Sequence, residues 1–68
     1  MRVTAETITD EQIRALWRVA GNEMTGPILM AALNTPYVIN KRERGWTRAE
    51  VRTARARCAD ILNARSAK

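Results

Sequence analysis

Apolar positions near the C-terminus recur at helical spacing and predict the longest element of the chain, a helix over about residues 48–65. At about 100° per residue, these positions fall within one arc of roughly 100°. They are Val51, Ala54, Cys58, Ile61 and Leu62. Thr47 is the expected N-cap, because Thr47 and Glu50 form the T-x-x-E pattern of a capping box. Trp46 and Val51 have the spacing of a hydrophobic staple around this start.

A second amphipathic helix is predicted over about residues 10–21. The sequence T-D-E-Q, which begins at Thr9, is a further capping box with acidic residues at the positive end of the helix dipole. Its apolar face is expected to include Trp17 as a core anchor. The other members of this face are Ile13, Leu16 and Ala20, with Met24 on the same line if the helix continues.

A third, short helix is predicted over about residues 27–34. Pro27 suits the first helical position, where its missing N–H costs nothing. The unbroken apolar run Ile28–Leu33 indicates a helix that is buried on nearly all sides. Asn34 is placed to cap its end.

The segments outside these helices are short. Residues 1–8 have no helical period and allow a short extended arm. Residues 37–39 favour extended backbone, and residues 40–45 form a polar, cationic loop. The pattern therefore predicts one small all-α domain over residues 1–68. In it a short extended or irregular segment separates the helix over 27–34 from the last helix.

Length and composition restrict the chemistry. At 68 residues the chain is near the lower size limit for independent folding, and its apolar fraction is rich in alanine. We expect modest stability unless a partner or a second copy of the chain binds, so a homodimer is one of the alternatives that the sequence allows. The absence of histidine and the single cysteine exclude the usual zinc sites, a Cys-His nucleophile pair and a Ser-His-Asp triad. Because no paired carboxylates are visible either, we expect neither enzyme activity nor a metal or cofactor.

The sequence also indicates a compartment. A single cysteine is typical of a reducing environment, and it excludes an internal disulfide. The N-terminus lacks the apolar stretch of a signal peptide, and Ile28–Leu33 is too short to span a bilayer. We therefore expect a cytoplasmic protein that does not act on a membrane. Cys58 lies in the apolar arc of the last helix and is expected to be an inert, buried thiol.

Charge is distributed unevenly. Residues 1–34 hold three arginines against four carboxylates, whereas residues 35–68 hold nine cationic side chains against three acidic ones. This asymmetry favours an acidic or polyanionic partner, although arginine is also a good helix former on a solvated face. An arginine stripe lies directly beside the apolar arc of the last helix. The candidate binding residues are Lys41, Arg42, Arg44, Trp46, Arg48, Arg52 and Arg55. Trp46 is either a core anchor or a partner-contacting side chain.

Three helices with a cationic last helix raise the possibility of a helix-turn-helix protein. That motif needs a turn of about three or four residues before the recognition helix, and here the connection from Asn34 to Thr47 is much longer. If DNA were bound, the arginines of the last helix would approach the groove or backbone. The cationic loop would contact phosphates.

The phrases ITDEQIRALWR and ARARCADILNAR resemble segments of short uncharacterised open reading frames in phages and integrated elements of proteobacteria. The resemblance covers about a third of the chain. It implies a mobile-element gene, and small phage proteins without catalytic residues often act by binding. Some regulate transcription, and others block a host enzyme or a defence complex, as anti-CRISPR proteins do.

The expected function is therefore non-catalytic. We expect a binding module that inhibits or modulates a host protein or nucleoprotein complex in the bacterial cytoplasm. Its partner would have an acidic or nucleic-acid-binding surface, which the cationic residues would cover or compete for. The alternative is a DNA-binding transcriptional regulator that uses the same residues.

Overall fold

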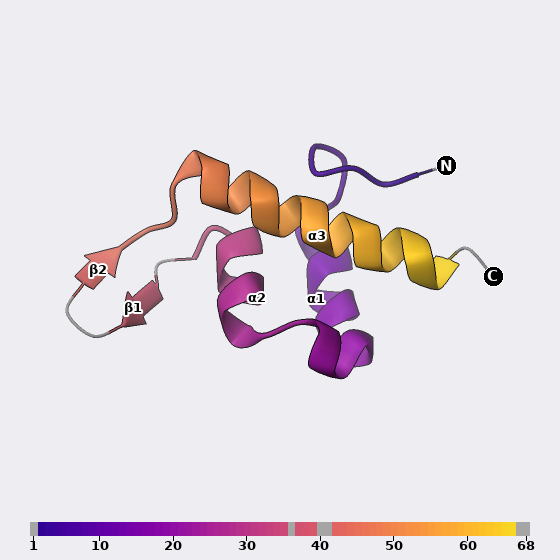
Figure 1. The fold of residues 1–68 in the computed structure, drawn as a ribbon, viewed down its shortest axis with the longest axis horizontal. Coiled ribbons are helices and arrows are strands. Elements are labelled where there is room, and N and C mark those ends of the chain that lie inside the picture. The colour runs from indigo at the N-terminus through magenta and orange to yellow at the C-terminus, as the bar shows by residue number, and fades with distance from the viewer. Residues whose placement is uncertain (1, 36, 40–41, 67–68) are drawn as a thin grey trace.

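The computed structural model describes residues 2–35, 37–39 and 42–66, and describes only the backbone of residues 22, 37–39 and 42–44. Three α-helices dominate this part of the chain, which confirms the predicted all-α fold (Figure 1). Their bounds lie within two residues of the predicted ones. The elements in order are α1 (Asp10–Ala20), the short 3-10 helix η1 (Gly21–Glu23), α2 (Gly26–Ala32), β1 (Tyr37–Ile39), β2 (Arg42–Arg44) and α3 (Arg48–Ser66).

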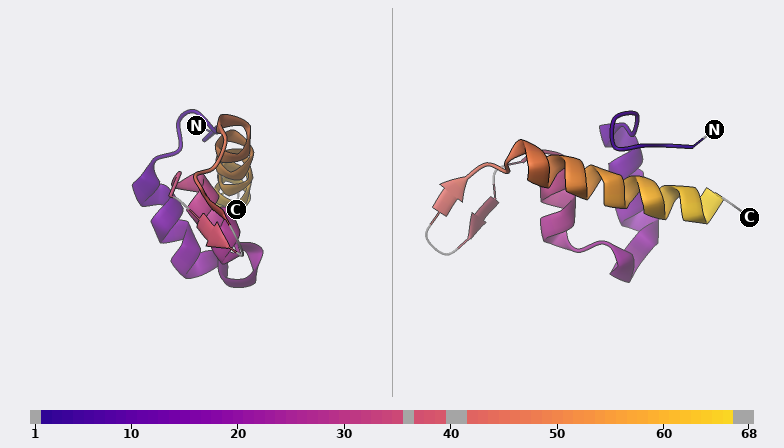
Figure 2. Two further views of the ribbon diagram at one scale, coloured as in Figure 1. Left: turned by 90° about the vertical axis from the view of Figure 1, so that its left-hand side faces the viewer. Right: turned by 45° about the horizontal axis from the view of Figure 1, so that its top comes forward.

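The helix α3 is the longest element, and both shorter helices pack against it. Figures 1 and 2 show α1 and α2 on the same side of α3, with the two strands projecting beyond its N-terminal end. The strands pair antiparallel, with Tyr37 opposite Arg44 and Ile39 opposite Arg42. The extended segment predicted before α3 is thus a hairpin. Residues 42–44, which were predicted to be loop, form its second strand because they pair with the β-favouring residues of β1.

Both predicted capping boxes are present. Thr9 Oγ1 accepts from the amide of Gln12 at 3.1 Å, and Gln12 Oε1 accepts from the amide of Thr9 at 2.8 Å. Thr47 and Glu50 exchange the equivalent bonds at 3.1 and 2.8 Å. These bonds satisfy amide donors that have no partner within their helices, and they fix where α1 and α3 begin.

Two residues in the left-handed region end the first two helices. Gly21 follows α1 with a φ of 56°, a conformation that glycine adopts without a Cβ clash. Asn34 follows α2 with a φ of 55°, and asparagine tolerates this region better than most residues. The amide of Asn34 donates to the carbonyl of Ala31, and that of Thr35 donates to the carbonyl of Met30, both at 2.9 Å. Asn34 therefore ends α2 as predicted.

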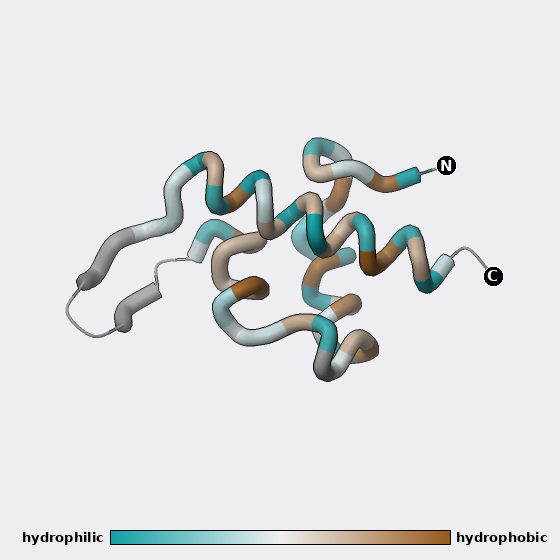
Figure 3. The backbone as a smooth tube through the Cα atoms, in the orientation of Figure 1, coloured by the Kyte–Doolittle hydropathy of each residue, from teal (hydrophilic) through white to brown (hydrophobic). Residues whose placement is uncertain are grey.

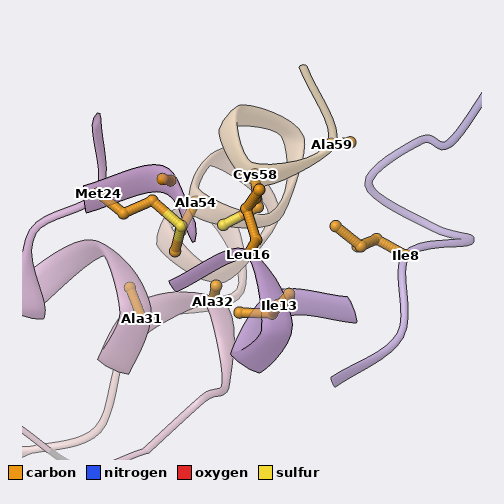
Figure 4. Close-up of a cluster of buried hydrophobic side chains, with 10 residues drawn as sticks. Ile8, Ile13, Leu16, Met24, Ala31, Ala32, Ala54, Cys58 and Ala59 are labelled. Atoms are coloured by element: carbon orange, nitrogen blue, oxygen red, sulfur yellow. The ribbon is translucent and has the colours of Figure 1, made fainter. Parts of the chain in front are cut away.

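The core is small and rich in alanine. Figure 4 shows side chains from the three helices and the N-terminal arm gathered in one cluster. Its buried members are Ile8, Ile13, Leu16, Ala20, Met24, Ala31, Ala32, Ala54, Cys58 and Ala59. Cys58 is fully buried, as its place in the apolar arc predicted. Half of the cluster is alanine, whose side chain is small, so each buried residue removes little apolar area from water.

Two burial predictions are wrong. Trp17 is 41% exposed rather than a core anchor. It lies at one edge of the α1 arc, and the buried part of that arc runs from Leu16 at the opposite edge through Ala20 to Ile13 and stops there. The helix α2 is also not enclosed on nearly all sides, since only Ala31 and Ala32 are buried. The molecule extends only 15 Å along its shortest axis, which leaves too little chain to surround α2.

The N-terminal arm, residues 2–9, lies along α3 and is not simply extended. The amides of Thr7 and Ile8 donate to the carbonyl of Thr4 at 3.1 and 2.9 Å, which forms a turn. The amide group of Asn63 on α3 binds Val3 twice, because Oδ1 accepts from the Val3 N–H and Nδ2 donates to its carbonyl. Ile8 is only 2% exposed, so the arm contributes to the core.

No helix in the described part of the chain has the length and hydropathy needed to cross a bilayer. The longest of them, α3, alternates between hydrophilic and hydrophobic residues along its whole length (Figure 3).

Candidate binding site

Four of the predicted binding residues line one hollow at the start of α3, which we call the cationic hollow. They are Trp46, Arg48, Arg52 and Arg55. The hollow has a volume of about 340 Å³, and its remaining lining comes from Ala5, Asn34 and Val51. Residues of the arm, the end of α2 and the first turns of α3 therefore meet here. The capping box at Thr47 positions the two sides, because it fixes the turn that separates Trp46 from Arg48.

The other three predicted residues are placed only in part. Arg42 and Arg44 belong to β2. In the sequence, this strand is followed by Gly45 and then by Trp46, which lines the cationic hollow at the start of α3. Their side chains and the whole of Lys41 lie outside what the structure describes.

Arg55 is directed into the protein. Its Nη1 donates to the carbonyl of Ala32 at 2.7 Å and to Asp10 Oδ1 at 3.1 Å. Its Nη2 donates to the carbonyl of Ile8 at 2.6 Å, and the side chain is 21% exposed. Guanidinium groups suit such sites because their donors diverge in a fixed plane. Arg55 therefore connects the arm, α1, α2 and α3, and little of its hydrogen-bonding capacity is left for a partner.

The helical geometry of α3 explains this inward position. Its buried arc extends to Ala59, which is 2% exposed and lies beyond the arc of apolar residues predicted from the sequence. At about 100° per residue, Arg55 projects between Cys58 and Ala59. Arg55, which the sequence placed at the edge of the apolar face, therefore points toward the interior of the protein.

Arg52 and Arg48 remain accessible. Arg52 forms an ion pair with Glu6 of the arm, and the two side chains are 66% and 59% exposed. Exposed pairs of this kind contribute little to stability and exchange readily with solvent or ligand. Arg48 is exposed, and no carboxylate in the described part of the chain lies within ion-pair distance of it. These two arginines are the guanidinium groups that the cationic hollow leaves accessible to solvent.

A second hollow lies on the other side of Trp46, between α2 and α3; we call it the apolar hollow. It has a volume of about 380 Å³. Its lining is Pro27, Ile28, Ala31, Trp46, Ala49, Glu50, Thr53, Ala54 and Arg57. Trp46 borders both hollows, so an apolar surface and a cationic surface meet at one indole ring.

The sequence patterns did not identify three residues that contribute long-range contacts here. Glu6 and Asp10 bind arginines of α3 that are more than forty positions away, and Asn63 binds Val3 across 60 positions. Their only sequence signal is weak: the acidic residues gather in the first half of the chain and the arginines in the second. The apolar hollow could have been anticipated only from the unusual hydrophobicity of residues 28–33 in so small a domain.

The single thiol is set apart from this surface. Burial raises the pKa of Cys58, and the positive charges of Arg55 and Arg57 oppose that rise. Because burial dominates, the thiol stays protonated at neutral pH and is a poor nucleophile. Among the described residues, no group of three or more histidine, cysteine, aspartate or glutamate side chains is placed to hold a metal ion.

No family model, curated protein or solved structure matches this chain.

Proposed function

We propose that this protein is a non-catalytic binding module that inhibits or modulates a host protein or nucleoprotein complex, in the manner of phage anti-host inhibitors such as anti-CRISPR proteins. Its place of action would be the cytoplasm of a bacterial host. One observation carries the proposal: Trp46 lies between an apolar hollow and a pair of accessible arginines. Tryptophan and arginine beside apolar contact area are typical of the residues that dominate protein–protein binding energy.

The composition of the surface favours a protein target over bare nucleic acid. A phosphate-binding surface needs several cations free to neutralise phosphates. Here Arg55 binds backbone carbonyls, which leaves Arg48 and Arg52 as the accessible arginines of the cationic hollow. The apolar hollow adds nothing to phosphate binding, whereas it suits a side chain from a protein surface. An acidic protein surface with apolar side chains matches both hollows.

A DNA-binding regulator is the second candidate. It is favoured by the succession of Arg42, Arg44 and Arg48, which runs from β2 directly into α3. The helix-turn-helix arrangement is not a good model for it, because a hairpin takes the place of the short turn before α3. Such a regulator would use the hairpin and the start of α3 on the phosphate backbone.

A capture experiment with matched variants tests the first candidate. The test variant is Arg48→Ala/Arg52→Ala, and the control is Arg14→Ala/Arg18→Ala, which removes the same charge from exposed positions of α1. In a lysate of the native host, the wild type and the control should retain the same protein after nuclease treatment. The test variant should lose it. Retention of the partner by the test variant would remove the cationic hollow from the binding site.

A salt titration on duplex DNA separates the two candidates. A regulator should bind with an affinity that falls steeply and log-linearly with salt, and it should prefer some sequences by ~10³ or more. A module that docks on a protein should bind DNA weakly and without sequence selectivity. Tight, selective DNA binding by the wild type would overturn the first candidate.

A further inference from the structure

We propose that the two hollows together bind one acidic segment of a partner protein. A bulky apolar side chain of that segment enters the apolar hollow, and a neighbouring carboxylate pairs with Arg48 and Arg52. This inference rests on the proposed binding function and refines it by assigning the chemistry of the bound segment.

The apolar hollow has the size and lining for one side chain. Its α3 wall contributes Ala49 and Ala54, and its α2 wall contributes Ile28 and Ala31. Alanine at these positions leaves room between the helices, and about 380 Å³ is within the range of ligand-binding pockets. Pro27 and Ala49 are exposed and Ile28 is half-buried, so apolar surface is open to water. Covering that surface with a leucine- or phenylalanine-sized group is favourable.

The cationic hollow already binds a carboxylate. Glu6 of the arm pairs with Arg52, and this contact marks where a carboxylate is accommodated. Both side chains are largely exposed, so a carboxylate of the partner can replace Glu6 at little cost. Arg48 lies beside this pair in the same hollow and offers a second cation.

The remaining charges favour an acidic segment over a basic one. Arg57 is exposed at the rim of the apolar hollow. The carboxylate of Glu50 lines the same hollow and offsets that charge, so the lining of the apolar hollow is neutral. The positive charge is concentrated in the adjoining cationic hollow, which three arginines line, and residues 35–68 carry nine cationic against three acidic side chains. A segment with leucine flanked by glutamates complements this distribution.

A short peptide is a sufficient probe. The acetylated peptide Glu-Glu-Leu-Glu-Glu is titrated into the full chain, and binding is followed by the fluorescence of Trp46. The titration uses a Trp17→Phe background, which removes the exposed indole of α1 and leaves Trp46 as the sole tryptophan. Peptides with lysine in place of glutamate, or serine in place of leucine, should bind about tenfold more weakly or worse. Equal binding of all three peptides would overturn the inference.

Variants locate the probe. Ala49→Gln fills the apolar hollow without adding charge and should weaken binding of the acidic peptide by about tenfold. Ala15→Gln makes the same change at an exposed position of α1 and should have no effect. Glu6→Gln releases Arg52 and should tighten binding a few-fold. A probe that binds Ala49→Gln as tightly as it binds the wild type, or that is indifferent to Glu6→Gln, does not occupy these hollows.

The inference and the proposed function fail separately. If the Arg48→Ala/Arg52→Ala variant loses its partner but the acidic peptide does not bind the wild type, the binding function stands and the segment chemistry is wrong. If the peptide binds as expected but the same variant keeps its partner, the hollows bind acidic segments and the proposed function lies elsewhere on the molecule.

Discussion

The guanidinium group of Arg55 makes hydrogen bonds to three other segments of the described chain. It donates to the carbonyl of Ile8 in the arm, to the carbonyl of Ala32 at the end of α2, and to the carboxylate of Asp10 at the start of α1. Hydrogen bonds from a charged donor contribute about 1.5–3 kcal/mol when the acceptors would otherwise be left without a partner. Arg55 is therefore a stabilising residue first.

Replacing Arg55 tests that role. Arg55→Ala should lower the free energy of unfolding by about 1.5–3 kcal/mol, because two carbonyls lose a charged donor. Arg57→Ala, an exposed arginine on the same helix, should change it by less than about 0.5 kcal/mol. Urea denaturation of the two variants measures the difference. Equal shifts would show that Arg55 acts only as a surface charge.

The Cys58 thiol gives the protein a pH dependence of known sign. Burial raises its pKa above the ordinary value of 9.0, so the folded protein keeps the thiol proton to higher pH than the unfolded chain does. The stability from this group is complete below pH 9.0 and is lost as the pH rises through the folded-state pKa. From neutral pH to above 9.0, the free energy of unfolding should fall more for the wild type than for Cys58→Ala. Urea titrations of the two proteins at a series of pH values measure this difference. Identical pH profiles of the free energy of unfolding would contradict the prediction.

At this scale the sequence predicted burial well at the centre of each helical face and inconsistently at its edges, where Leu16 is buried and Trp17 is not. Cys58 lies at the centre of the α3 face and is buried, whereas Trp17 lies at the edge of the α1 face and is exposed. Arg55 is the opposite case, a charged edge residue that points inward. A helical projection gives the direction of a side chain, but the position of the neighbouring segment decides whether anything covers it.

Among the elements, helix starts were the most predictable feature. A capping box is a contact between residues three positions apart, so both partners are visible in the sequence. Both boxes, at Thr9 and at Thr47, have the expected bonds. The second strand of the hairpin was missed because Arg42–Arg44 has no β-favouring residue, and its pairing with β1 is not visible in the local pattern.

The caps have a measurable energy. Thr9→Ala and Thr47→Ala should each lower the free energy of unfolding by about 1 kcal/mol, because an amide at the helix start loses its acceptor. Thr53→Ala is the matched control: Thr53 is exposed inside α3, where alanine has the higher helix propensity, so this variant should be as stable as the wild type or slightly more stable. The midpoints of chemical denaturation of the three variants, compared with that of the wild type, test these expectations. If all three threonine variants behaved alike, the capping bonds would contribute nothing.

At the scale of the whole molecule, the N-terminal arm contributes to the core and is bound to α3. Among the residues whose side chains are described, the core holds ten buried hydrophobic residues, half of them alanine, so each larger apolar side chain carries a large share of the buried area. Ile8 is one of these, although it lies outside every helix. The arm is held against α3 by Asn63 and by the bond from Arg55 to the Ile8 carbonyl, at sequence separations of 60 and 47 positions. Contacts at such separations leave no periodic signal, so the placement of the arm could not be predicted.

Truncation of Ile8 measures how far the core relies on the arm. Ile8→Ala should lower the free energy of unfolding by about 2–5 kcal/mol, which is a large part of the total for a domain of this size. Val19→Ala removes an aliphatic side chain that is 59% exposed and should cost less than about 0.5 kcal/mol. Thermal melts followed by circular dichroism compare the two. A small effect at Ile8 would mean that the three helices form the core without the arm.

The alanine-rich contact between α2 and α3 also determines how stability varies with temperature. The heat capacity change of unfolding is proportional to the apolar area that becomes exposed, at about 12–15 cal/mol/K per residue for ordinary domains. Alanines at positions 31, 32, 54 and 59 expose little such area, which places this chain at the low end of that range. A small heat capacity change flattens the stability curve. We therefore expect the free energy of unfolding to vary little with temperature and the thermal transition to be broad.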